Sequence, residues 1–194
     1  MSIAFVLGNG VSRQQVDLNN LRHFGSIYGC NALYRDFVPT VLISTDRPIS
    51  ERIQDSGYAL KNRFYTRRPT ATSGANPVPQ KYFGFSSGPI AASIAAFDNP
   101  AIVYLLGFDM GPVHNKFNNV YADTEFYKKS SAVPTYTGNW VKQLTTVMKD
   151  FPKIPFVRVM GGTTAPVKEF DAVKNFRTMD IADFLNRINN TKEL

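Results

Sequence analysis

Short apolar runs that end in glycine or polar residues recur along the 194-residue chain. The first run covers residues 3–7 and is followed by Gly8-Asn9-Gly10, and the longest covers residues 101–106 before Gly107-Phe108-Asp109. Runs without alternating polar positions are typical of strands buried on both faces, as in the centre of a parallel sheet. The pattern predicts further strands at residues 26–29, 40–43, 63–66 and 155–159.

Helical segments separate these strands. They are expected at residues 11–22, from Pro48 onward, and at residues 87–97, 139–149 and 181–188. Strands that alternate with helices form crossover units in a mostly parallel sheet. The sequence therefore predicts an α/β fold, a three-layer Rossmann-like domain. Neither an internal repeat nor a linker interrupts the pattern, so residues 1–194 are interpreted as a single domain.

Two long segments lack any apolar period and are expected to lie over the strand C-terminal ends. They cover residues 67–85 and 110–137. Loops of this length are usually functional or disordered, and ligands of parallel α/β sheets bind at the carboxyl ends of the strands. The polar tips Gly8-Asn9-Gly10, Cys30-Asn31 and Gly107-Phe108-Asp109 should therefore line one crevice.

Composition restricts the ligand and the compartment. The chain has 22 Lys and Arg against 15 Asp and Glu, a net charge of +7, which suits an anionic partner such as a nucleotide, a sugar phosphate or a nucleic acid. Only residues 61–68 hold a dense basic patch, so a nucleic-acid groove is disfavoured. One cysteine excludes an internal disulfide, and no apolar run is long enough for a membrane span. With no signal-peptide pattern, a cytoplasmic location is expected.

Two turns are candidates for binding phosphate. In Gly8-Asn9-Gly10-Val11-Ser12, the glycines permit close backbone approach, and the predicted helix beyond them offers free N–H groups. Arg13 stands where a dinucleotide fingerprint has its third glycine, so a simple tight turn remains an alternative. Ser86-Ser87-Gly88 precedes an alanine-rich helix and is a second candidate, with a serine N-cap as its compatible alternative.

The remaining candidate groups are a carboxylate and a histidine. Asp109 is placed to accept hydrogen bonds from a ribose or sugar hydroxyl, or to order its own loop. His114 lies in the second long loop. There it could act as a general base or be a solvent-exposed side chain without a catalytic role. The carboxylates of Asp123 and Glu125 are too few to specify a metal, so no metal site is predicted.

A series of motifs occurs in a characteristic order between residues 7 and 139. These are Leu7-Gly8-Asn9-Gly10-Val11-Ser12, Val16-Asp17, Tyr28-Gly29-Cys30-Asn31-Ala32-Leu33-Tyr34, Ser87-Gly88, residues 102–109, Tyr121-Ala122 and Tyr136-Thr137-Gly138-Asn139. The series resembles the bacterial sialyltransferases that decorate lipooligosaccharide. A related group on the same scaffold is similar to the archaeal hydroxymethylpterin pyrophosphokinases.

The resemblance implies a glycosyltransferase domain that binds a cytidine nucleotide-sugar without a metal. By this resemblance, Asn9 and Asn31 contact the nucleotide and its phosphate, while Ser87 and Gly88 line its pocket. Tyr121 would hydrogen-bond the leaving phosphate. The complete set of predicted nucleotide-binding residues is Gly8, Asn9, Gly10, Ser12, Asn31, Ser87, Gly88 and Asp109, and the predicted catalytic residues are His114, Tyr121 and Tyr136.

One position departs from the family pattern in a way that affects the reaction. Asn139 stands where the family has its catalytic histidine, so His114, or else Asp109 or Asp123, is the expected base. The favoured hypothesis is transfer of a sugar from a nucleotide-sugar substrate to an unspecified acceptor, with no other cofactor. Alternatives are a nucleotide-binding or sequestering module without turnover and a pyrophosphokinase-like enzyme. A homo-oligomer is compatible with each.

Overall fold

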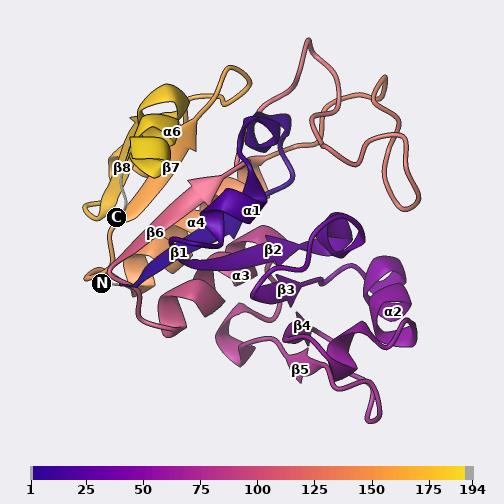
Figure 1. Ribbon diagram of the computed structural model, residues 1–194. Helices are drawn as coiled ribbons and strands as arrows, with labels where there is room; N and C mark the ends of the chain where they lie inside the picture. The colour runs from indigo at the N-terminus through magenta and orange to yellow at the C-terminus, as the bar shows by residue number, and fades with distance from the viewer. Residues whose placement is uncertain (1, 191–194) are drawn as a thin grey trace.

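The computed structural model describes residues 2–190 and contains one sheet of eight strands. Figure 1 shows the sheet crossing the molecule with helices on both sides. All pairings between neighbouring strands are parallel. The strands are β1 (Ile3–Leu7), β2 (Ser26–Cys30), β3 (Val41–Ile43), β4 (Phe64–Thr66), β5 (Asn76–Pro77), β6 (Ile102–Leu106), β7 (Phe156–Met160) and β8 (Phe176–Asp180).

The strand order places a switch of direction beside β1. From one edge to the other the order is β5-β4-β3-β2-β1-β6-β7-β8. The chain therefore winds outward from β1 to β5, returns to pair β6 with the other side of β1, and continues to β8. At such a switch the crossovers on either side diverge and leave a crevice at the carboxyl ends of the two strands. The tips of β1 and β6 flank this crevice.

Alternating side chains of β1 serve two cores. Ala4 and Val6 pack toward α3 and α4, whereas Phe5 and Leu7 pack toward the opposite layer. The α-helices are α1 (Leu18–Leu21), α2 (Arg47–Asp55), α3 (Ser87–Phe97), α4 (Gly138–Asp150), α5 (Lys168–Asp171) and α6 (Ile181–Asn190). The 3₁₀ segments are η1 (Val11–Gln15), η2 (Asn31–Arg35), η3 (Tyr58–Leu60) and η4 (Gln80–Tyr82). The predicted three-layer α/β Rossmann-like fold is confirmed.

The expected helix at residues 11–22 is wrong as a single element. It splits into η1 and the short α1, because Val16 between them is extended, with φ −109° and ψ 126°. Asp17 then begins α1 by accepting a hydrogen bond from the Asn19 N–H at 2.9 Å. An aspartate accepts from the backbone most readily at a helix N-cap, which favours a new start here over continuation.

Two edge strands were not expected from the sequence. The two-residue β5 lies within the first long loop and contains Pro77. The outer strand β8 presents Arg177 and Thr178 to solvent, so it has no continuous apolar run. The second long loop is confirmed, since residues 111–137 contain no helix and no strand longer than an isolated bridge. Every helix within residues 2–190 is too short or too polar to cross a bilayer.

Candidate functional site

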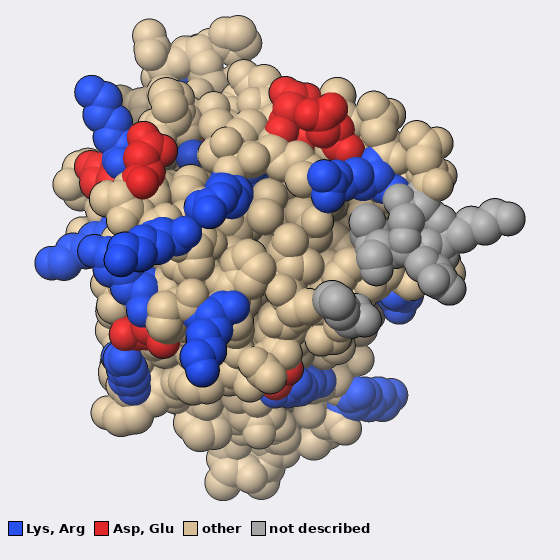
Figure 2. Space-filling view, turned by 90° about the vertical axis from the view of Figure 1, so that its left-hand side faces the viewer, with Lys and Arg blue, Asp and Glu red and all other residues tan. Residues whose placement is uncertain are grey.

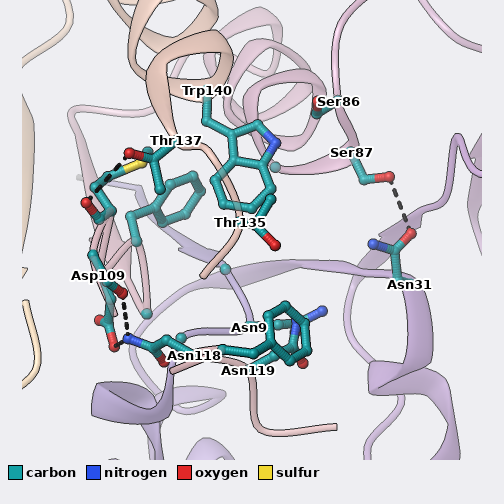
Figure 3. A pocket seen from close by; sticks show the side chains of 18 of the residues that line it. Asn9, Asn31, Ser86, Ser87, Asp109, Asn118, Asn119, Thr135, Thr137 and Trp140 are labelled. Atoms are coloured by element: carbon teal, nitrogen blue, oxygen red, sulfur yellow. Dashed lines mark hydrogen bonds between the residues drawn. The ribbon is translucent and has the colours of Figure 1, made fainter. Parts of the chain in front are cut away.

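A pocket of about 290 Å³ lies at the carboxyl ends of the central strands. The tips of β1, β2 and β6 form one part of its wall, and the first residues of α3 and α4 form another (Figure 3). The second long loop completes it. Its polar and aromatic lining residues include Asn9, Asn31, Thr45, Asp46, Ser86, Ser87, Phe108, Asp109, Phe117, Asn118, Asn119, Thr135, Thr137 and Trp140.

The structure brings most of the predicted nucleotide-binding residues to this one pocket. Its lining contains Gly8, Asn9, Gly10, Asn31, Ser87, Gly88 and Asp109. Ser12 is buried behind the lining and donates a short hydrogen bond from its hydroxyl to Asp109. The expected convergence of separate strand tips is therefore observed. Whether these residues bind a nucleotide stays a prediction.

Hydrogen bonds within the protein already use most N–H groups of the Gly8–Ser12 turn. The Gly8 and Gly10 N–H groups each donate to backbone carbonyls near the end of β6 at 2.8 Å. The Val11 N–H donates to Asn118 Oδ1 at 2.9 Å, and the Ser12 N–H donates to Asp109 Oδ2 at 3.2 Å. A side chain at Gly10 would collide with the Asp109 carboxylate, so this glycine permits internal packing. The turn therefore holds its own anion, Asp109.

Asp109 is 3% exposed, and its two carboxylate oxygens accept hydrogen bonds from several sides. Besides Ser12, the donors are Asn118 Nδ2 at 3.0 Å, Thr163 Oγ1 at 2.7 Å and Thr164 Oγ1 at 3.2 Å. A carboxylate with this many donors orders the surrounding segments and has little capacity left for a ligand hydroxyl. The loop-ordering reading of Asp109 fits this geometry better than sugar binding.

A buried arginine fixes the backbone on either side of this carboxylate. Arg158 on β7 donates from Nε and Nη2 to the Phe108 carbonyl at 2.9 and 2.7 Å, and from Nη2 to the Asp109 carbonyl at 3.1 Å. Burial lowers the pKa of Arg158 to about 10, and the Asp109 charge partly opposes that shift. The end of β6 is consequently held rigidly beneath the pocket.

On the β2 side of the pocket, only some of the hydrogen-bonding groups have partners. Asn31 has φ 53°, a left-handed conformation that asparagine tolerates, and its Oδ1 accepts from Ser44 Oγ at 2.9 Å and from Ser87 Oγ at 3.0 Å. The Ser87 hydroxyl also accepts from the Thr45 N–H at 3.0 Å. Asn31 Nδ2, in contrast, has no partner within residues 2–190, and Figure 3 shows it directed toward the pocket.

The start of α3 also carries unpaired donors. Within the described chain, the Ser87 and Gly88 N–H groups donate to no backbone or side-chain acceptor, and Pro89 has no N–H. Ser86 donates its N–H to Gln143 Oε1 at 2.8 Å but provides no side-chain cap. Unpaired N–H groups and the helix dipole favour an anion at this position. Of the two predicted phosphate turns, this one is open.

Asn9 adds a further unsatisfied group. Its Nδ2 donates to the Cys30 carbonyl at 3.5 Å, whereas its Oδ1 is buried without a hydrogen-bond partner among the described residues. Across the pocket, Trp140 in the first turn of α4 lies beside Thr135 (Figure 3). Trp140 is the only tryptophan of the chain. An amide and an indole therefore face the same space from opposite walls.

The predicted catalytic residues lie elsewhere. Tyr121 is buried in the core on the other face of the sheet, where its hydroxyl accepts from Arg13 Nη2 at 3.0 Å and burial raises its pKa to about 12. His114 is exposed in the second loop and is absent from the pocket lining. Tyr136 is 77% exposed and lines a neighbouring groove. None of the three reaches the pocket in this structure.

The charge of the pocket differs from that of the whole chain. Although the net charge is +7, the described lining contains no Lys, Arg, His or Cys, and its only ionisable side chains are Asp46 and Asp109. Asp46 is the N-cap of α2, is exposed, and makes no side-chain capping bond. It is therefore the pocket carboxylate that, unlike Asp109, is not occupied by donors of the described chain. No cluster of three His, Cys, Asp or Glu suitable for a metal occurs in residues 2–190.

Several lining residues were missed by sequence reasoning. Asn118 and Thr135 come from an aperiodic loop that gave no signal, and Asp46 follows a strand tip that was not included in the predicted crevice. Trp140 could have been noticed as the single tryptophan beside the Tyr136-Thr137-Gly138-Asn139 motif. No protein-family model, curated protein or solved structure matches the chain. Its function is therefore argued from the pocket.

Proposed function

We propose that this protein is a nucleotide-sugar-dependent transferase whose nucleotide occupies the pocket at the strand tips. The observation that carries the proposal is the set of unpaired polar groups around that space: Asn9 Oδ1, Asn31 Nδ2 and the first N–H groups of α3. Of these groups, Asn9 Oδ1 is buried, and leaving a buried polar group unsatisfied costs about 1–3 kcal/mol, so such a group usually has a partner. A ligand with donors and acceptors would supply it.

The wall chemistry suits an uncharged nucleoside. Asn9 offers an acceptor and Asn31 a donor, the two kinds of group needed to hydrogen-bond a base edge or a ribose. Trp140 offers an apolar ring face for stacking. The volume of about 290 Å³ is near the lower end of small-molecule pockets, about 300 Å³. Cytidine as the base rests on the motif resemblance alone.

The phosphate is assigned to the start of α3. At the glycine turn, the N–H groups of Gly8, Gly10, Val11 and Ser12 already donate within the protein, and the Asp109 carboxylate would repel a second anion. The N–H groups of Ser87 and Gly88 are free and carry the positive end of an eleven-residue helix. Donors held in place in this way stabilise the charge that develops on a leaving phosphate without needing a metal.

Sugar transfer also requires removal of a proton from the acceptor. As the C–O bond between sugar and phosphate breaks, the acceptor oxygen forms the new C–O bond and its proton passes to Asp46. Asp46 is the base in this proposal because its carboxylate lines the pocket without a capping bond. His114 and Asp109, the bases expected from sequence, are respectively outside the lining and saturated with donors.

A binding module without turnover is the second candidate. It is favoured by one observation: the proposed proton transfer depends on a single exposed carboxylate, with no His, Lys or Cys in the described lining to assist it. In that case the same contacts would hold a nucleotide without chemistry. The two candidates share the pocket and differ only in product formation.

Trp140 fluorescence tests the shared part of the proposal. Titration with cytidine monophosphate and with a cytidine nucleotide-sugar should give a saturable change in emission, since the only indole lines the pocket. Asn31→Ala should weaken binding about tenfold, the effect of losing a hydrogen bond to a ligand. Asn186→Ala, on the exposed surface of α6, is the matched control and should bind normally. No saturable change with either ligand would overturn the proposal.

Chromatography of released nucleotide separates enzyme from module. The transferase predicts slow release of nucleotide from the nucleotide-sugar, with water as a poor acceptor, and faster release when a true acceptor is present. Asp46→Asn should retain the fluorescence titration and lose about 100-fold or more in product formation, the usual contribution of a general base. Binding without any release by the wild-type protein would favour the module.

A further inference from the structure

A second cavity adjoins the pocket on the side of α4. It is an open groove of about 890 Å³ between α4 and the segment that leads into α5. Its lining comprises Met110, Tyr136, Thr137, Gly138, Val141, Lys142, Thr145, Thr146, Lys149, Pro166, Val167, Lys168 and Glu169. Met110 and Thr137 line both cavities. Thr137 Oγ1 donates to the Met110 carbonyl at 3.5 Å, so this pair forms the partition between them.

The groove is basic where the pocket is not. Its charged lining consists of Lys142, Lys149, Lys168 and Glu169. Lys142 and Lys149 are seven positions apart and so lie on one face of α4. None of the three lysines has a carboxylate within ion-pair distance in the described chain. Figure 2, which views the side of the molecule that carries β7 and β8, shows basic side chains covering more of that surface than acidic ones.

An orphan hydroxyl lies in the same lining. Thr145 Oγ1 is buried and has no hydrogen-bond partner among the described residues. By contrast, the neighbouring Thr146 Oγ1 donates to the Lys142 carbonyl at 3.0 Å, the usual arrangement for a threonine within a helix. Thr145 is thus a residue of the groove lining whose hydroxyl makes no hydrogen bond to its own helix or to any other described residue. Its position between Lys142 and Lys149 on α4 makes an anionic oxygen a suitable partner.

We propose that this groove binds the acceptor of the transfer, and that the acceptor is a small organic molecule with at least two negative charges, carried by phosphate or carboxylate groups. The proposal rests on the transferase function. Unpaired ammonium groups attract such a ligand, and Thr145 adds a hydrogen bond to one of its oxygens. The Met110–Thr137 partition is the place where an acceptor hydroxyl passes from the groove to the pocket.

Calorimetric titration with inorganic pyrophosphate and with a sugar bisphosphate tests the groove directly. Changing Lys142, Lys149 and Lys168 together to Gln should weaken binding of both probes at least tenfold. The control changes Lys61, Lys116 and Lys153 to Gln, three exposed lysines outside the groove lining. Both triple variants lose the same charge, so a specific groove predicts less than a twofold effect in the control. Affinity in the wild type should also fall as salt is raised.

Three results would overturn the proposal: no binding of either probe by the wild type, equal losses in both triple variants, or no loss in the groove variant. Nucleotide titration of the groove variant by Trp140 fluorescence keeps this test separate from the proposed function. A nucleotide affinity within twofold of the wild type, together with lost pyrophosphate binding, supports the groove. If the nucleotide titration fails in the wild type while the groove still binds pyrophosphate, the proposed function fails and the groove remains as an anion site alone. Titration with a dicarboxylate such as glucarate, which has the two charges required, distinguishes carboxylate from phosphate recognition.

Discussion

Two turns at the carboxyl ends of the strands, Gly8–Ser12 and Ser86–Gly88, differ in whether their backbone N–H groups have hydrogen-bond acceptors within the protein. At the end of β1, the N–H groups of Gly8, Gly10, Val11 and Ser12 all donate within the protein, and Asp109 occupies the place that an anion would take. At the start of α3, the Ser87 and Gly88 N–H groups remain unpaired. Asn31 Nδ2 and Asn9 Oδ1 are likewise without partners in the described chain.

This difference shows why a glycine-rich turn is weak support for phosphate binding. Glycine in such a turn permits a close approach of any group, and at Gly10 that group is the side chain of Asp109. The open turn has the poorer motif, Ser86-Ser87-Gly88, yet retains free donors. The hydrogen bonds of the two turns therefore distinguish a turn closed on itself from a turn with free donors, where the residue types do not.

The largest expected effect comes from removing the internal anion. Asp109→Ala leaves the donors of Ser12, Asn118, Thr163 and Thr164 without their acceptor, and should lower the free energy of unfolding by about 3 kcal/mol. Urea denaturation measures this change. Asp171→Ala, at an exposed position, should stay within about 0.5 kcal/mol of the wild type. Equal stability of the two variants would mean that Asp109 is not the structural anion of its turn.

An intermediate effect is expected at Asn9, a residue of the glycine turn whose side-chain oxygen has no partner among the described residues. Asn9→Leu removes an amide whose Oδ1 has no partner, so the free energy of unfolding should change by less than about 1 kcal/mol. The affinity for cytidine monophosphate should nevertheless fall about tenfold, measured by Trp140 fluorescence. Asn118→Leu is the counterpart, since that amide contacts Val11, Asp109 and Gly111 and its loss should cost about 2 kcal/mol of stability. Unchanged nucleotide affinity in Asn9→Leu would contradict the proposed contact between Asn9 Oδ1 and the nucleotide.

The smallest effect concerns Cys30, which precedes Asn31 on the open side. Its thiol is buried, and burial raises its pKa to about 12. The folded state therefore keeps the proton, whereas the unfolded chain releases it above about pH 8.5. The buried thiol's contribution to the free energy of unfolding is complete below that pH and is lost as the pH rises toward 12. Between pH 8 and pH 9.5 the free energy of unfolding should fall by about 1 kcal/mol.

Urea denaturation of Cys30→Ala across the same pH range isolates this contribution. In the variant, the free energy of unfolding should not show the fall of about 1 kcal/mol between pH 8 and pH 9.5. Alkylation provides a second measurement: the native thiol should resist iodoacetamide at pH 8.5 and react on unfolding. Rapid modification of the native protein would show that water reaches the β2 tip, contrary to the burial of Cys30.

The central fold could be predicted because its strands are buried on both faces. Residues of β1 and β6 form uninterrupted apolar runs, and a helix follows or precedes each of the central strands. The edges could not be predicted in this way, since β8 exposes polar side chains and β5 has only two residues. The first crossover was predicted as one helix because periodicity alone did not reveal the extended Val16.

The candidate site was predicted in position and only partly in chemistry. Because carboxyl ends of parallel strands meet at one edge, the convergence of Asn9, Asn31 and Asp109 followed from topology. Topology did not show which of these side chains are already hydrogen-bonded within the protein. The donors to Asp109 come from Ser12, Asn118 and the residues after β7, which are far apart in the sequence. Tyr121 illustrates the same limit, because the turn that carries it directs the ring into the opposite core.

The lack of basic side chains in the described pocket lining has a consequence for how a phosphate monoester would be bound there under the proposed function. The positive end of α3 would attract the doubly charged form of such an ester more strongly than the singly charged form, whereas the carboxylate of Asp46 would repel the doubly charged form more. The second ionisation of a phosphate ester occurs near pH 6, so most free ligand at neutral pH is doubly charged. The balance between α3 and Asp46 would therefore set the sign of the proton exchange on association, which the heat of mixing in buffers of different ionisation enthalpy measures.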